Sequence, residues 1–205
     1  MPAVRAVIFD LDECLIDSRA AWAYAVEQAL VAVTGQQLRA SRDLVTEYRH
    51  RPWRHVFAVL CADTTQAQRC CEIAEAMFHR SALKRLLVFE GIGMALDALR
   101  ASRIQIGAIS RLPHSQAIKQ IDSTGLDRFV VVLSPTPDNQ KWAPAARIDE
   151  VVGYLGRNRD DTVVVATTRD LIGREFRVLE AGWGSDAHGD VLLPSDLAPR
   201  LRRLG

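Results

Sequence analysis

Four short apolar runs rich in β-branched residues recur along this chain and are separated by stretches with a helical hydrophobic period. The runs lie at residues 4–10, 104–110, 130–133 and 162–166. Apolar runs of this length without a helical period are typical of strands that are buried on both faces of a sheet. Strands that alternate with helices form parallel sheets through right-handed crossovers. The sequence therefore predicts an α/β fold whose core is a doubly wound parallel sheet with helices on both faces.

Residues 19–85 interrupt this alternation. Apolar residues there recur at intervals of three and four, which predicts an all-helical segment. We therefore expect a core made of residues 1–18 and 86–205, with a helical insertion between its two parts. Within the core, the spacing of apolar residues after the fourth run predicts a further helix over residues 172–179.

Composition and charge exclude several classes of protein. The 205 residues include 26 Lys and Arg against 25 Asp and Glu, a formal net charge of +1. The sequence therefore lacks the excess of basic residues that is typical of proteins that bind nucleic acids or membrane surfaces. No apolar run approaches the roughly 18 residues that a membrane helix needs. The cysteines show no spacing typical of a metal site, and we expect them to be reduced thiols in a cytoplasmic protein: Cys14, Cys61, Cys70 and Cys71. The sequence carries no indication of an oligomeric state.

Polar side chains follow the apolar runs at the points where the predicted strands end. They are Asp10 and Asp12, Ser110, a stretch that ends in Lys141, and residues 167–170. Because ligands bind at the carboxyl ends of the strands in an open parallel sheet, we expect these groups to converge. A carboxylate can attack phosphorus, a neighbouring acid can protonate the leaving oxygen, and cations can neutralise the phosphoryl oxygens. The set of groups fits phosphoryl transfer.

Three motifs in this order resemble those of the haloacid dehalogenase-like (HAD) superfamily. Residues 8–18, IFDLDECLIDS, resemble its first motif, FDLDGTLxDS. Residues 109–110 match its strand-end Ser/Thr motif, and residues 141–144, KWAP, resemble KPxP. The resemblance implies a Rossmann-like core and identifies residues 19–85 as the inserted α-helical cap that closes over the substrate in this superfamily.

The resemblance also implies a Mg²⁺-dependent phosphatase that hydrolyses a small phosphorylated metabolite through an aspartyl-phosphate. By the matching motifs, Asp10 would be the nucleophile and Asp12 the general acid and base, with Mg²⁺ held by the Asp10 carboxylate and the Asp12 backbone carbonyl. Ser110 and Lys141 would hold the phosphoryl group. Arg111, which follows Ser110, is a further candidate for substrate binding.

The chain departs from the superfamily pattern within each of these motifs. Glu13 and Cys14 replace the Gly-Thr of the first motif. Arg111 stands where Asn is usual, and Trp142 replaces the first Pro of KPxP. Cys14 is either a buried packing residue or a redox-sensitive thiol beside the nucleophile loop.

The fourth motif, which normally supplies a metal carboxylate, is the most altered. Counting from the preceding helix places that carboxylate at Ala166 or Thr167, whereas counting back from the next apolar segment places it at Asp170. Only Asp170 has a suitable side chain, and Glu175 lies five residues further on as a supporting acid. Both a longer turn and an impaired metal site fit this pattern, and a helix N-cap is the structural alternative for Asp170.

Basic residues cluster around Pro52-Trp53 in the predicted cap. They either meet an anionic substrate, for which Arg51 is the candidate, or form a solvated helix face.

Two functions compete with the phosphatase. One is a catalytically weakened protein that binds a phosphorylated ligand or a protein partner, which the altered fourth motif favours. The other is a phosphomutase. Dehalogenation is disfavoured because dehalogenases of this superfamily lack an acid at the position of Asp12.

Overall fold

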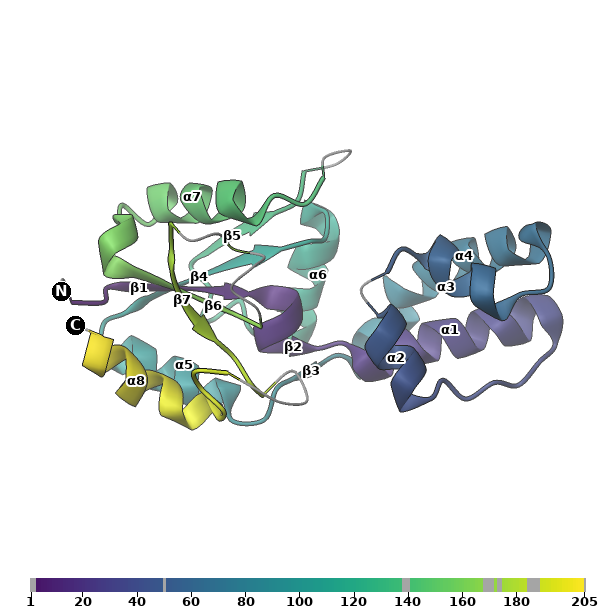
Figure 1. Ribbon diagram of the computed structural model, residues 1–205, viewed down its shortest axis with the longest axis horizontal. Helices are drawn as coiled ribbons and strands as arrows, with labels where there is room; N and C mark the ends of the chain where they lie inside the picture. The colour runs from purple at the N-terminus through teal and green to yellow at the C-terminus, as the bar shows by residue number, and fades with distance from the viewer. Residues whose placement is uncertain are drawn as a thin grey trace. The chain divides into compact units, whose positions relative to one another are not determined.

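The computed structural model describes residues 3–49, 51–137, 141–167, 172, 175–183 and 189–204. The chain divides into two compact units (Figure 1). One comprises Met1–Asp17 with Leu87–Gly205 and is called the core unit below; the other, Ser18–Leu86, is called the helical unit. No helix in the described ranges is long and apolar enough to span a membrane.

The core unit is built on a five-stranded parallel sheet with the order β5-β4-β1-β6-β7. Its strands are β1 Ala6–Asp10, β4 Gln105–Ser110, β5 Val132–Pro135, β6 Thr162–Ala166 and β7 Arg177–Glu180. Every residue of β1 and β6 is buried, because both strands lie inside the sheet with helices above and below. The α/β prediction with a parallel sheet is confirmed.

Helices cover both faces of this sheet (Figure 1). They are α5 Ile92–Ala101, α6 His114–Thr124, α7 Pro144–Tyr154 and α8 Leu197–Leu204. Helix α7 packs on β4 and β5, while α5 packs on β4 and α8 from the other side. An apolar cluster between α7 and the sheet includes Ile8, Ile148 and Val164.

The prediction of a helix over residues 172–179 is wrong for residues 177–179, which form a strand. Ile172 lies in a turn, and residues 177–180 form the edge strand β7, in which Val178 and Leu179 pair with Val164 and Val165 of β6. The outer edge of β6 carries backbone N–H and C=O groups that need partners, and β7 supplies them. The fourth predicted run is correct, whereas the third begins two residues later than expected, at Val132.

The helical unit contains α1 Arg19–Thr34, α2 Arg42–Tyr48, α3 Trp53–Leu60, α4 Thr64–Phe78 and a 3-10 segment at Ser81–Arg85. Its apolar core joins α1, α3 and α4. Trp53 stacks on Trp22 with ring centroids 6.0 Å apart and on Phe57 at 6.3 Å. Aromatic pairs at this separation add to the stability gained by burial alone.

Two short strands of the core unit lie where the chain leaves it and re-enters it. Strand β2 (Ile16–Asp17) pairs antiparallel with β3 (Leu87–Val88). The chain therefore crosses between the units through two adjacent strands.

Gly107 of β4 is required for close approach of the sheet to α7. A Cβ atom at this position would collide with Val151 Cγ1, and Val151 is fully buried. We expect Gly107→Ala to lower the free energy of unfolding by about 1–3 kcal/mol, because the packed helix has no room to move away. Urea denaturation measures the effect.

The matched control is Gly153→Ala on α7, where an added Cβ meets no atom within 4 Å. Because alanine is a better helix former than glycine, we expect this change to raise the free energy of unfolding by up to about 1 kcal/mol. Equal stabilities of the two variants would contradict the close packing of β4 against α7.

Candidate active site

Asp10 and Asp12 lie at the carboxyl end of the central strand. Strand β1 ends at Asp10, and residues Leu11–Leu15 then form one turn of π-helix. The Asp10 Oδ1 atom accepts a hydrogen bond of 3.1 Å from the backbone N–H of Asp12. Asp10 is only 3% exposed, whereas Asp12 is partly exposed. The turn thus brings the two acidic residues together at the edge of the sheet where ligands bind.

The neighbouring strand β4 delivers Ser110 to the same place. Ser110 is fully buried, and its Oγ donates to the Asp12 carboxylate at 3.0 and 3.2 Å. The backbone N–H of Arg111 donates to Asp12 Oδ2 at 2.8 Å. Because β1 and β4 pair in parallel register, with Asp10 opposite Ile109, their ends meet as the sequence indicated. The Asp12 carboxylate is therefore held in one orientation by donors from β4.

Arg111 contacts both acidic residues. Besides the bond from its backbone to Asp12, its Nη2 atom lies 3.9 Å from Asp10 Oδ2. The guanidinium also lies over the indole ring of Trp142, with its Cζ 5.7 Å from the ring centroid. It is the cation nearest to Asp10 among the ion pairs of the described residues.

Electrostatics at the site favour the protonated carboxyls. Burial, followed by the charge of Asp12, raises the pKa of Asp10 from 3.8 to about 8, and the Arg111 guanidinium opposes this shift. Burial also raises the pKa of Asp12, against hydrogen bonds from the Arg111 N–H and the Ser110 hydroxyl. The raised pKa of Asp12 favours a role in which this carboxyl holds a proton and then releases it.

The donor set fits a hard divalent cation. The Arg111 guanidinium lies 3.9 Å from Asp10 Oδ2, yet burial still raises the pKa of Asp10, so a bound cation would favour the ionised form of this carboxyl, and carboxylate oxygens are ligands that Mg²⁺ accepts. Within the described ranges no group of three His, Cys, Asp or Glu side chains could hold a metal. Of the two further acids predicted from the fourth motif, Asp170 lies outside the described residues and Glu175 is exposed in a turn.

Two further predicted residues, Lys141 and Arg51, have exposed side chains. Lys141 is exposed, and no hydrogen bond or ion pair of its side chain occurs in the described part of the chain. Arg51 is exposed within the helical unit. The structure thus brings together Asp10, Asp12, Ser110 and Arg111 out of the predicted set.

Three residues near the site had no role assigned from the sequence. Glu13 is a third acid in the turn after β1 and is only 5% exposed, and its charge also raises the pKa of Asp10. Trp183 donates from Nε1 to the Cys14 carbonyl at 2.9 Å and so supports the loop. The indole ring of Trp142 lies against the guanidinium of Arg111. The replacements at positions 13 and 142 were visible as departures from the family motifs, whereas nothing in the sequence pointed to Trp183.

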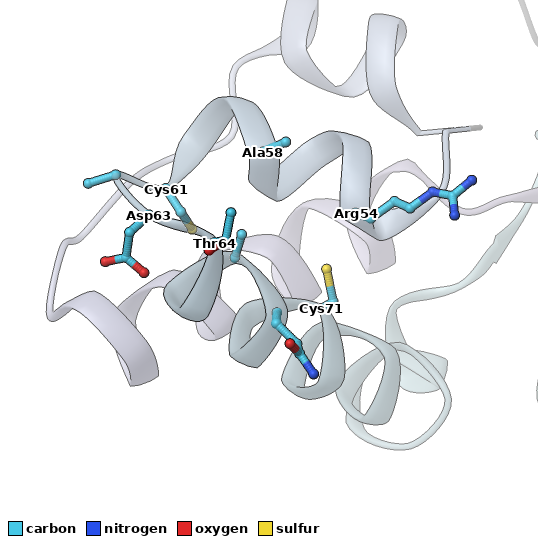
Figure 2. Close-up of a pocket in the computed structure, with 9 residues that line it drawn as sticks. Arg54, Ala58, Cys61, Asp63, Thr64 and Cys71 are labelled. Carbon is cyan, nitrogen blue, oxygen red and sulfur yellow. The ribbon is translucent and has the colours of Figure 1, made fainter.

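A separate pocket of about 490 Å³ lies entirely within the helical unit (Figure 2). Its walls come from α3, the loop after it and the first turns of α4, and they include the thiols of Cys61 and Cys71. Arg54 and Asp63 lie near opposite ends of this pocket in Figure 2. Arg51 does not line this pocket, whose polar side chains besides the thiols are Arg54, Asp63, Thr64 and Gln68.

The raised pKa of Asp10 predicts a pH-dependent cost to the metal-free protein. Well below pH 3.8 this carboxyl is protonated in both the folded and the unfolded chain. Between pH 3.8 and about 8 it ionises in the unfolded chain while the folded chain keeps its proton, so stability is lost as the pH rises. We expect Asp10→Asn to unfold at a higher temperature than the wild type in the presence of a chelator, by a margin that is larger at pH 8 than at pH 5.

Thermal unfolding at the two pH values measures this effect. Glu175→Gln is the control, since it removes a carboxylate that is exposed, whereas burial is the main cause of the effect expected at Asp10. A margin for Asp10→Asn that does not grow with pH would contradict the proposed protonation of Asp10.

Comparison with known proteins identifies the family of this chain and related structures with the same fold. The sequence profile of the haloacid dehalogenase-like hydrolases matches residues 7–173, which confirms the resemblance drawn from the motifs. A search of proteins with curated functions found no matching sequence.

Solved structures with the same fold are distant in sequence. A HAD-superfamily hydrolase of subfamily IA, variant 1, from Geobacter sulfurreducens aligns with a TM-score of 0.80 and 17% identity over 97% of this chain and 96% of its own. Protein Tyrosine Kinase A from Mycobacterium tuberculosis aligns at 0.76 and 18% identity over 98% and 99%. A predicted phosphatase from Clostridium acetobutylicum aligns at 0.73 and 16% identity over 98% and 99%. At such identities the structural likeness establishes the fold.

Proposed function

Because the chain belongs to the haloacid dehalogenase-like hydrolases, we propose that it is a Mg²⁺-dependent phosphatase that hydrolyses a small phosphorylated metabolite through an aspartyl-phosphate. The observation that carries the proposal is the arrangement of the two acids. Asp10 is buried at the end of β1, and Asp12 is oriented beside it by Ser110 and the Arg111 N–H. This arrangement supports Asp10 as the nucleophile and Asp12 as the proton donor.

In the first step, a carboxylate oxygen of Asp10 attacks phosphorus and the bond to the leaving oxygen breaks. Asp12 donates its proton to that oxygen, so the alcohol leaves neutral. The raised pKa of Asp12 supports this role, because a carboxyl with an ordinary pKa holds almost no proton at neutral pH.

In the second step, Asp12 accepts a proton from a water molecule as that water attacks the phosphorus of the aspartyl-phosphate. The bond to Asp10 breaks, inorganic phosphate leaves, and both acids return to their starting states. The hydrogen bonds from Ser110 and Arg111 keep the Asp12 carboxylate in place through both steps.

The phosphoryl group would be bound by Ser110, Arg111 and Lys141, with Arg51 as a further candidate from the helical unit. When bound, Mg²⁺ would be held by the Asp10 carboxylate and the Asp12 backbone carbonyl and would supply positive charge to the phosphoryl oxygens. Asp170 and Glu175 remain the candidate acids for completing that site.

An assay with a generic aryl phosphate tests the proposal. We expect turnover that requires Mg²⁺, is abolished by a chelator and returns on adding Mg²⁺ in excess. No turnover across a panel of phosphorylated metabolites, combined with thermal stabilisation by some of them, would instead identify a binding protein. Transfer of the phosphoryl group within a sugar phosphate, without release of phosphate, would identify a mutase.

We propose that the helical unit is the cap. The paired strands β2 and β3 support this, since they place its two connections side by side and so allow it to move as one body. We expect orthovanadate to slow amide hydrogen exchange at residues 16–18 and 86–88. Unchanged exchange there, at a vanadate concentration that inhibits turnover, would contradict the cap role.

A further inference from the structure

Two of the positions at which the chain departs from its family motifs are in contact with each other. Arg111 replaces the usual Asn after Ser110, and Trp142 replaces the first Pro of KPxP. These residues come from different loops, after β4 and before α7, yet the guanidinium lies over the indole ring. Arginine is the cation that stacks best on an aromatic face, and tryptophan is the aromatic residue that holds it best. The two replacements thus form one cation–π pair.

The backbone that carries Arg111 is fixed independently of this pair. Thr136 donates to the Ser110 carbonyl from its N–H at 2.9 Å and from its Oγ1 at 3.0 Å. The N–H of Leu112 donates to Ser110 Oγ at 3.1 Å, and the N–H of Arg111 itself is bound to Asp12. With the backbone held, the direction of the guanidinium depends on what its side chain packs against.

One edge of that guanidinium is held near Asp10 without making its hydrogen bonds. Nη2 lies 3.9 Å from Asp10 Oδ2, which is too long for a hydrogen bond, and Nε is buried with no hydrogen-bond partner among the described residues. Nε and Nη2 together form the edge that binds a carboxylate in the exposed pair of Arg159 with Asp149, at 2.9 and 2.7 Å. At Arg111 the part of the chain that the structure describes offers neither donor a hydrogen bond, and a buried donor without a hydrogen bond is unfavourable unless a ligand accepts from it.

We infer that Trp142 is a positioning residue that holds the Nε–Nη2 edge of Arg111 beside Asp10, where it receives an oxyanion of the phosphoryl group. The pair supplies a planar, two-donor cation next to the nucleophile, which Asn and Pro at these positions do not provide. The inference rests on the proposed function for the identity of the oxyanion, and it assigns Trp142 a role that acts entirely through Arg111.

A double-mutant cycle tests the pair, with inorganic phosphate as the probe and isothermal titration calorimetry of the full chain in Mg²⁺ as the readout. We expect Arg111→Gln to weaken phosphate binding by about 10- to 100-fold, the range for a lost charge-assisted pair of hydrogen bonds. Trp142→Leu is expected to weaken it by about 3- to 30-fold, and Trp142→Phe to recover part of that loss.

The decisive measurement is Trp142→Leu in the Arg111→Gln background. If the indole acts through the guanidinium, this second change leaves phosphate affinity within about twofold. A loss as large as in the wild-type background would show that Trp142 merely supports the packing of the site and would overturn the inference. Undetectable binding of phosphate by the wild-type chain would overturn it as well.

A matched control exists elsewhere in the core unit. Arg128 lies over the Phe129 ring at 4.6 Å and is exposed, so Arg128→Gln removes a cation–π pair without touching the site. We expect it to leave phosphate affinity unchanged, and thermal unfolding confirms that each variant is folded. Coupling between positions 111 and 142 without turnover of any phosphate ester would refute the phosphatase alone, whereas turnover without coupling would refute the pair alone.

Discussion

Replacing Asp10 by Asn is expected to reduce kcat by roughly 10⁴-fold or more. The amide keeps the shape of the side chain and can still accept the hydrogen bond from the Asp12 N–H, which the carboxylate receives at 3.1 Å. It lacks the anionic oxygen that attacks phosphorus, so the covalent route is lost. Steady-state assays with an aryl phosphate in saturating Mg²⁺ measure the loss.

Asp122→Asn is the control for this change. Asp122 is an exposed carboxylate on α6, and its replacement alters the net charge by the same amount. We expect it to retain full turnover. If Asp10→Asn kept a turnover close to that of the wild type, Asp10 would not be the nucleophile.

The sheet could be predicted because its inner strands are surrounded by apolar side chains on both faces. Strands β1 and β6 are buried on both faces, so their sequences are short, mostly apolar runs containing β-branched residues, and these runs fit no helical period. The edge strand β7 is shorter. The residues Ile172, Phe176 and Leu179 follow one another at intervals of four and three, and such intervals also fit a helix. Only the pairing of β7 with β6 decides between the two structures, and pairing between distant segments is not encoded locally.

The central acids could be predicted for a similar reason. The sheet order places the ends of β1 and β4 side by side, so residues that follow those strands must meet, and Asp12 and Ser110 do. The contact of Arg111 with Trp142 depends instead on how two loops pack, which no periodicity records. Motif departures at both positions were visible, but their relation became visible only in three dimensions.

Replacing Asp12 by Asn is expected to have an effect that depends on the leaving group. An activated aryl oxide leaves without a proton, whereas an alkoxide does not, so the general acid matters far more for an alkyl phosphate. We expect kcat/KM to fall by about 10²- to 10⁴-fold for alkyl phosphates and by much less for an aryl phosphate carrying a strongly electron-withdrawing group.

The same substitution removes the base that activates water in the second step. With the activated aryl phosphate, Asp12→Asn should therefore form the aspartyl-phosphate and then stall, which predicts a burst of about one phenolate per enzyme molecule followed by slow turnover. Ser110→Ala is the comparison, because it removes the hydroxyl that orients Asp12 at 3.0 Å but keeps the carboxylate. It should lower the rate without changing the dependence on the leaving group. An equal loss for alkyl and aryl phosphates in Asp12→Asn, with no burst, would assign proton transfer to another group.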